Sequence, residues 1–299
     1  PLTSRTMVNR LWSLMFGRGI ATSVNDLGGQ GTYPSYPDLL DQLAGAFIVS
    51  GGDIKNMLRT IANSEAYRRE SKPTSKLLQV DPYNELFARQ GRFRVDAESV
   101  RDIALATSCL LVEKIGGQSV RPYQPAAYYA ELNFPRRKYQ ADMGDQQYRR
   151  GLYTHWQRTF LHPMLKAFDA PSREECTAAR SQSNTPLQAL TLLNDPTFLE
   201  AARVFASRIV REGGDDTHQR MSWAYRNAVS RHPSAEVEAT LSDLYDQHLQ
   251  HYQANPGDAK KLISHGLMPI DDTLDAAELA AWTSVARVIL NLHETITRY

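Results

Sequence analysis

The feature that most constrains the fold of this chain is a long interruption in its helical pattern. From residue 118 to about residue 184, neither the 3.6-residue period of a helix nor the alternation of a strand persists. Proline lacks the backbone N–H that a helix interior requires, and prolines stand at positions 122, 125, 135, 163 and 171. Long ordered loops within compact domains are uncommon and often functional. Residues 118–184 are therefore expected to be irregular, with at most a short strand at 151–154, and to be where a site is sought first.

Helical patterns occupy the N-terminal side of this segment. Apolar residues at three- and four-residue steps predict a helix over residues 4–16, ended by Gly17. Cap residues and first-turn prolines predict further helices over 35–50, from Asp53, from Asp81-Pro82, and from Asp96 to 111.

Helix-start signals resume on the C-terminal side. Thr185 and Gln188 have the spacing of a capping box, Asp195-Pro196 is a second start, and Ser234 and Asp275 begin later helices. The polar residues 255–272 are expected to form a loop with one helical turn. The pattern predicts a mainly α fold, a helical bundle or orthogonal helical array. Its parts, 1–117, 118–184 and 185–299, are expected to make one compact domain cut from a longer protein.

The composition argues against several classes of protein. Lys and Arg number 34 against 33 Asp and Glu, which gives no electrostatic footprint for nucleic acid. No apolar run is long enough to span a membrane, and no signal peptide is visible. Two cysteines, Cys109 and Cys176, are too few for a disulfide scaffold. Buried free thiols are the favoured interpretation of these two residues, and a single bridge is the alternative.

Short catalytic and cofactor motifs are missing from the sequence. The glycine run from Gly28 lacks the spacing and the lysine of a phosphate-binding loop, and no Cys-x-x-Cys-His motif for covalent haem exists. His248 and His251 are three residues apart on a predicted helix, but a solvated helix face explains them better than a metal site. No cofactor or metal is therefore expected in this chain.

An aromatic and basic group in the irregular segment is one candidate site. Arginine forks beside aromatic platforms suit an anionic sugar, whereas the alternative is an exposed loop with weak local ion pairs. The candidate ligand-binding residues are Tyr123, Tyr128, Arg136, Arg137, Tyr148, Arg149, Arg150 and Trp156.

A polar group around the later helix starts is the second candidate. Helix caps and a buried polar network explain it as well as a ligand does. One chemical alternative is a thiol enzyme in which Cys176 pairs with His155 or His162, with Cys176 in the first turn of a short helix capped by Ser172. The whole group comprises Asp169, Arg173, Cys176, Arg180, Gln188, Asn194 and Asp195.

Several long motifs resemble one known family. They include Phe16-Gly17-Arg18-Gly19-Ile20, Arg121-Pro122-Tyr123-Gln124-Pro125, Tyr148-Arg149-Arg150-Gly151-Leu152-Tyr153, Phe168-Asp169-Ala170-Pro171-Ser172-Arg173-Glu174-Glu175-Cys176 and Leu193-Asn194-Asp195-Pro196. Together they resemble the planctomycete C-terminal domain of unknown function 1553. The sequence departs from that pattern at His293, where Asp is expected, and at His155, where an aromatic residue is usual.

This resemblance implies a biological context without a reaction. Such domains usually lie in large exported proteins downstream of a cytochrome c domain, so haem c would be carried by an upstream domain. The resulting hypothesis is an accessory or scaffold domain whose partners are the upstream domains of its parent protein. The alternatives are a carbohydrate-active or carbohydrate-binding module for complex sulfated polysaccharide, and the Cys176 thiol enzyme.

Overall fold

The computed structural model describes residues 1–125, 128–131, 138–158 and 160–298 and confirms a mainly α fold. The described residues contain twelve α-helices and one two-stranded sheet, and 53% of the chain is helical. Within this described part, none of the helices has both the length and the apolar character that crossing a bilayer requires.

The chain divides into two compact units. Unit 1 comprises Pro1–Arg94, Glu175–Arg180 and Thr297–Tyr299, and unit 2 comprises Val95–Glu174 and Ser181–Ile296. These units do not coincide with the three parts that the sequence pattern distinguishes, because unit 2 combines the irregular segment with helices from both sides of it.

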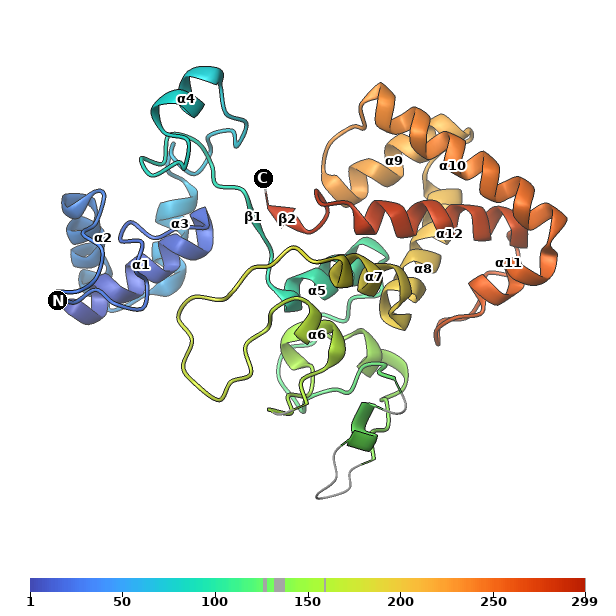
Figure 1. Cartoon of the computed structure of the whole chain (residues 1–299), viewed down its shortest axis with the longest axis horizontal. Coiled ribbons are helices and arrows are strands. Elements are labelled where there is room, and N and C mark those ends of the chain that lie inside the picture. The colour runs from blue at the N-terminus through green and yellow to red at the C-terminus, as the bar shows by residue number, and fades with distance from the viewer. Residues whose placement is uncertain (126–127, 132–137, 159, 299) are drawn as a thin grey trace. The chain divides into compact units, whose positions relative to one another are not determined.

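Unit 1 is built around the amphipathic first helix. Its elements are α1 (Leu2–Phe16), α2 (Pro37–Val49), α3 (Ile54–Ala62), α4 (Ser75–Val80) and the antiparallel pair β1 (Phe93–Arg94) and β2 (Thr297–Arg298) (Figure 1). The apolar stripe of α1 packs against α2 and α3, and Gly17 ends α1 in the left-handed conformation, as predicted. Asp53 caps α3 by accepting the N–H of Asn56.

The predicted helix start at Asp81-Pro82 is wrong. Helix α4 ends just before this pair, and the Asp81 carboxylate accepts the backbone N–H groups of Glu85 and Leu86 at 2.8 and 2.9 Å. The side chain therefore closes an irregular turn instead of capping a helix. An Asp-Pro pair is compatible with a helix start and with an irregular turn. Which of the two forms depends on the backbone N–H groups that the Asp carboxylate binds.

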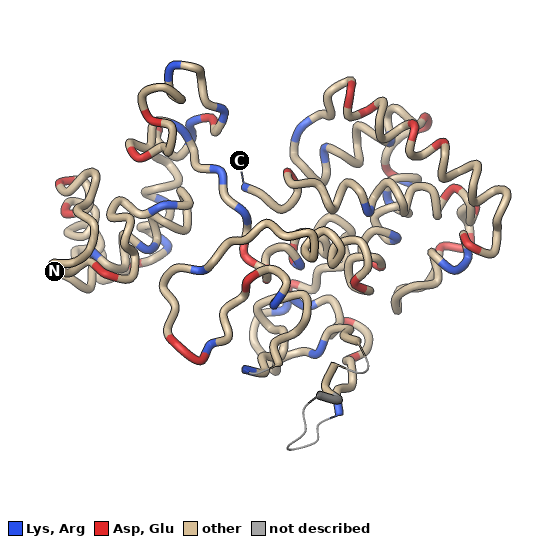
Figure 2. The backbone as a smooth tube through the Cα atoms, in the orientation of Figure 1, with Lys and Arg blue, Asp and Glu red and all other residues tan. Residues whose placement is uncertain are grey.

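Unit 2 is organised on two long buried helices. Its elements are α5 (Ala97–Thr107), α6 (Pro163–Ala167), α7 (Pro186–Asn194), α8 (Pro196–Glu212), α9 (Thr217–Val229), α10 (Ala235–Ala254), α11 (Pro256–Ile263) and α12 (Ala276–Asn291). Helix α12 packs against α8, α10 and α11, and most residues of α8 and α12 are buried. Acidic and basic residues of both units are interspersed along the chain (Figure 2).

Two predictions of helix extent in unit 2 are wrong. Helix α5 ends at Thr107 instead of continuing to residue 111, and Cys109 then takes a positive φ of 61°. The segment 255–272, expected to be a loop with a single turn, contains α11. Pro256 starts this helix, and Ala259 and Ile263 are buried, so tertiary packing stabilises a segment whose sequence is mostly polar.

The irregular segment is held by short 3-10 turns and by long-range backbone bonds. Its described elements are η1 (Tyr128–Glu131), η2 (Gly144–Tyr148), η3 (Gly151–Tyr153) and α6. The short strand suggested for 151–154 is instead a 3-10 turn, after which Thr154 makes one isolated bridge to Val120. The density of prolines and the absence of a period thus correctly predicted little regular structure here.

The start of α12 provides a local test of the helix-capping analysis. Asp275 accepts the N–H of Glu278 at 2.8 Å, so Asp275→Ala is expected to lower the free energy of unfolding by about 1 kcal/mol. Urea unfolding would measure this loss, with exposed Asp272→Ala as the neighbouring control. Equal effects of the two substitutions would contradict the capping role.

Candidate functional site: a polar pocket in unit 2

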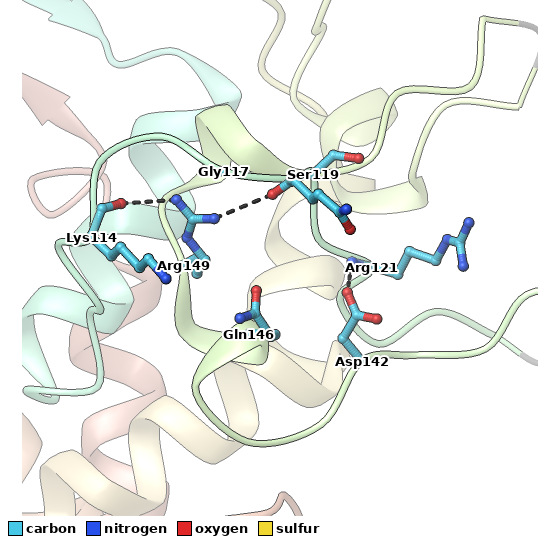
Figure 3. Close-up of a pocket in the computed structure, with 8 residues that line it drawn as sticks. Lys114, Gly117, Ser119, Arg121, Asp142, Gln146 and Arg149 are labelled. Carbon is cyan, nitrogen blue, oxygen red and sulfur yellow. Dashed lines mark hydrogen bonds between the residues drawn. The ribbon is translucent and has the colours of Figure 1, made fainter.

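Unit 2 contains an open polar pocket of about 600 Å³ (Figure 3). Two segments form it, residues 114–121 and residues 142–149. None of the eight described lining residues is aromatic, and three of them are cationic and one is a carboxylate. They are Lys114, Gly117, Gln118, Ser119, Arg121, Asp142, Gln146 and Arg149.

Arg149 fixes the first wall of the pocket. Its side chain is buried, and its guanidinium donates to the carbonyl oxygens of Lys114 at 2.9 Å and Gln118 at 3.2 Å (Figure 3). It also donates to the carbonyl oxygen of Gly116 at 2.6 Å. The same guanidinium lies 3.9 Å from the centre of the Tyr153 ring, whose hydroxyl accepts the N–H of Gly116. Arg149 thus acts as an internal brace for the loop that carries Lys114 and Gln118.

Asp142 and Gln147 fix the second wall. The Asp142 carboxylate accepts the Arg121 backbone N–H at 2.7 Å, and the Asp142 N–H donates to the Arg121 carbonyl at 2.9 Å. The buried Gln147 amide donates to the carbonyl oxygens of Arg121 and Asp142 and accepts the N–H of Tyr123 at 3.2 Å. The two segments are therefore held together by one backbone–backbone hydrogen bond and by bonds from the Asp142 and Gln147 side chains to backbone groups.

The side chains left for a ligand are basic or neutral hydrogen-bonding groups. Lys114, Gln118, Ser119 and Gln146 are exposed and line one space. Lys114 and Gln146 point into that space, whereas the Arg121 guanidinium extends outward from the rim (Figure 3). This set can donate to sulfate or carboxylate oxygens and can exchange hydrogen bonds with hydroxyl groups.

A buried polar network lies behind the second wall. The fully buried Arg101 guanidinium donates to the Gln147 carbonyl oxygen and, at 3.1 Å, to the Thr197 hydroxyl. Burial lowers the pKa of Arg101, and the negative charges of Asp195 and Asp102 oppose that shift. Burial likewise raises the pKa of the Asp195 carboxyl, which caps α8 by accepting the Thr197 N–H. Arg101 thus connects the pocket wall to the start of α8.

Glu200 on α8 is the second centre of this network. Its carboxylate accepts the hydroxyl of Tyr148 at 2.8 Å, the hydroxyl of Tyr123 at 3.3 Å, and the N–H groups of Leu267 and Met268 at 2.6 and 2.8 Å. Burial, together with the Glu200 charge, raises the pKa of both tyrosines. The two phenols are therefore kept as neutral donors to Glu200.

His162 completes the network as a neutral imidazole. It is buried, its Nε2 lies 2.7 Å from the Tyr123 carbonyl oxygen, and its Nδ1 accepts the Met164 N–H. These contacts require the proton on Nε2. Burial lowers the pKa of His162 to about 4.

The structure disperses the aromatic and basic candidates instead of gathering them in one cleft. Tyr123 and Tyr148 donate to Glu200, Tyr128 donates to the Leu161 carbonyl, and Arg149 braces the pocket loop. Arg150 is exposed near Glu113. Trp156 donates to the Ser172 carbonyl and lies under Arg173, whose guanidinium is 3.7 Å from the ring centre. Arg136 and Arg137 lie outside the residues that the structure describes.

The second group of candidates is largely engaged in helix caps and local contacts. Asp169 accepts the N–H and the hydroxyl of Ser183, both at 2.7 Å, and the Gln188 amide donates to that hydroxyl. The predicted capping box of Thr185 and Gln188 is present. Asn194 donates to the Leu190 carbonyl within α7, and Arg180 is exposed in unit 1.

Two predictions about the cysteines are wrong. Cys109 and Cys176 are both free and exposed instead of buried. The short helix expected after Ser172 is absent, because the Ser172 hydroxyl accepts only the Glu174 N–H at 3.4 Å and the chain continues as bends. The helix N-terminus that would activate the Cys176 thiol is therefore not formed.

Glu200, Arg203, Arg101 and Gln147 were not among the sequence candidates. Each is about 1% exposed, although charged side chains are seldom buried without a partner. A usable signal is the position of Glu200 and Arg203 within an otherwise apolar stretch of α8, three residues apart. The described residues contain no group of three His, Cys, Asp or Glu placed to hold a metal ion.

Fold and pocket together define a mainly α protein with a braced, polar surface pocket. The family described as "Protein of unknown function (DUF1553)", PSD1, matches residues 1–245, and the chain belongs to this family. The match covers most of both units and ends within α10. No curated protein and no solved structure matches the chain.

Proposed function

We propose that this chain is a non-catalytic accessory domain that binds an anionic, hydroxyl-rich saccharide in the polar pocket of unit 2. The observation that carries the proposal is the convergence of exposed Lys114, Gln118, Ser119 and Gln146 on one space whose two walls are braced from within. The volume of about 600 Å³ lies within the roughly 300–1,000 Å³ typical of small-molecule sites.

The chemistry of the lining favours sulfated or carboxylated sugar over a neutral one. The ammonium group of Lys114 can pair with an anionic substituent, and the amides and the hydroxyl can bind ring hydroxyls. Asp142, the only carboxylate among the described lining residues, already accepts a backbone N–H. Its repulsion of an anion is thereby reduced.

The use of the buried acid–base groups within the protein supports the accessory role. Glu200 and His162 are buried and hydrogen-bonded to neighbouring protein groups, and neither is among the described residues that line the pocket. In the proposal, the chemistry is performed by other domains of an exported, cytochrome c-linked parent protein. This domain would hold the polysaccharide for them.

Calorimetry with matched galactan fragments tests the binding proposal. A κ-carrageenan tetrasaccharide, which is sulfated, is expected to bind at least about tenfold more tightly than an agarose tetrasaccharide, which is neutral. Lys114→Ala is expected to weaken sulfated-sugar binding about tenfold because it removes a charge-assisted contact. Arg121→Ala is expected to weaken it only about two- to threefold, since that guanidinium extends from the rim.

Exposed cations outside the pocket provide the matched controls. Lys260→Ala on α11 and Arg226→Ala on α9 remove the same charges from unit 2 and are expected to leave the affinity unchanged. An absence of saturable binding, or an equal loss in these controls, would show that the pocket is not the binding site.

A further inference from the structure

Unit 1 contains a second cavity, of about 330 Å³, beside the C-terminal end of α1. Its lining differs from that of the pocket in unit 2, because five of its thirteen described lining residues are aromatic residues or prolines. Phe16 and Phe87 are buried members of the hydrophobic core of unit 1, where their rings meet edge to face, and the other three are Pro73, Pro82 and Tyr83.

The loop that carries Tyr83 is held by buried polar groups. The buried Arg89 guanidinium donates to the carbonyl oxygens of Asp81 at 3.0 Å and Pro82 at 2.7 Å. Asn84 and Arg89 exchange two further hydrogen bonds, and the Asp81 carboxylate closes the turn. The loop is therefore pre-organised, and yet it leaves the Tyr83 side chain 80% exposed at the cavity.

Every charged residue among the described residues that line this cavity is an arginine. These arginines are Arg18, Arg89 and Arg92. The Nη2 of Arg18 donates to the Thr22 hydroxyl at 3.1 Å and the Glu85 carboxylate at 2.9 Å, whereas its Nη1 donates to no described residue. Glu85 thus positions the Arg18 guanidinium, and Nη1 can donate to an incoming anion.

We infer that this cavity is a binding site for a small carboxylate that carries a flat apolar ring. The carboxylate would accept from Arg18, and the ring would lie against Tyr83 and the adjacent prolines. The cavity volume is near the lower end of small-molecule sites, which suits a single ring with a short acidic substituent. The inference is independent of the saccharide proposal, since it concerns the other unit and a different lining.

Ligand-observed NMR on the full chain tests this inference with three probes. Phenylacetate is expected to bind saturably, and phenylacetamide and acetate are each expected to bind at least about tenfold more weakly. The amide removes the charge and acetate removes the ring. Equal binding of either control compound, or no saturable binding of phenylacetate, would overturn the assignment.

Two substitutions locate the site, each with a matched control. Tyr83→Ala and Arg18→Gln are each expected to weaken phenylacetate binding at least about fivefold. Tyr33→Ala, which removes a 79% exposed tyrosine of unit 1, and Arg10→Gln, on the exposed face of α1, are expected to leave it unchanged. Arg18→Gln also removes the Arg18–Glu85 ion pair and could destabilise unit 1. Tyr83 is 80% exposed, so the Tyr83→Ala variant is expected to fold normally and to test the site independently. Unchanged binding in Tyr83→Ala would overturn the inference.

Discussion

Replacing Glu200 by alanine is expected to lower the free energy of unfolding of unit 2 by about 3–5 kcal/mol. The carboxylate is 1% exposed and accepts two tyrosine hydroxyls and two backbone N–H groups. Its removal leaves these donors buried without an acceptor, and each such group costs about 1–3 kcal/mol unless the structure rearranges. It also removes the negative charge that most favours the charged form of the buried Arg203.

The segment that depends most on Glu200 is the connection between α11 and α12. The N–H groups of Leu267 and Met268 bind the carboxylate, and Arg203, one turn further along α8, donates to the carbonyl oxygens of His265, Met268 and Pro269. Gly266 has a φ of 99°, and a Cβ there would lie 2.2 Å from the Glu200 Cδ atom. We expect this connection to lose protection against amide hydrogen exchange in Glu200→Ala.

Urea unfolding followed by tryptophan fluorescence measures the effect, because Trp156, Trp223 and Trp282 lie in unit 2 and only Trp12 lies in unit 1. Glu212→Ala is the control on the same helix. Glu212 pairs with Arg208 at the exposed end of α8, so its loss should cost at most about 1 kcal/mol. Glu200→Gln should be intermediate, since an amide oxygen still accepts. A loss in Glu200→Ala no larger than that in Glu212→Ala would refute the central role of Glu200.

Local signals predicted the helices well where a side chain caps the backbone that follows it directly. Asp53, Asp195 and Asp275 each accept an N–H two or three residues ahead, so the sequence contains the whole interaction. Asp81 has the same type of signal, but its carboxylate reaches four and five residues ahead and closes a turn. Helix α11 was missed because it is short, only two of its eight residues are buried, and it lies in a stretch of mostly polar residues.

The pocket was predictable only in part, because its geometry depends on pairs that are distant in sequence. The sequence directs attention to the irregular segment, and six of the eight described lining residues of the pocket lie in it. It predicted Arg149 as a group that contacts a ligand, whereas the structure uses its guanidinium to bind carbonyls about 31–35 residues away. No local pattern distinguishes an arginine that binds a ligand from one that braces a loop.

Acidification from pH 7 to pH 4 is expected to remove about 3 kcal/mol of stability from unit 2 through His162 alone. The side chain is buried in the neutral form, and burial lowers its pKa from 6.5 to about 4. Below pH 6.5 the unfolded chain binds a proton that the folded protein does not. The stabilising contribution is therefore complete above about pH 6.5 and is lost as the pH falls toward 4.

Two carboxyl groups have the opposite effect on the pH dependence of stability, so their contribution must be distinguished from that of His162. Burial raises the pKa of both Asp102 and Asp195, so between their unfolded pKa of 3.8 and their raised values the folded protein binds more protons. Acidification through that range stabilises the fold and reduces the net loss. The His162 contribution is consequently measured as a difference between variants rather than as the total pH dependence.

His162→Gln provides that difference, because glutamine does not titrate and its amide can still donate to the Tyr123 carbonyl. The variant is expected to be less stable than the parent at pH 7, and its urea-unfolding free energy should change less, by about 3 kcal/mol, between pH 7 and pH 4. His232→Gln, at an exposed imidazole, should keep the parent slope. If His162→Gln also keeps the parent slope, the folded protein must bind the proton at His162 as readily as the unfolded chain. The assignment of His162 as a neutral imidazole that donates to the Tyr123 carbonyl would then be refuted.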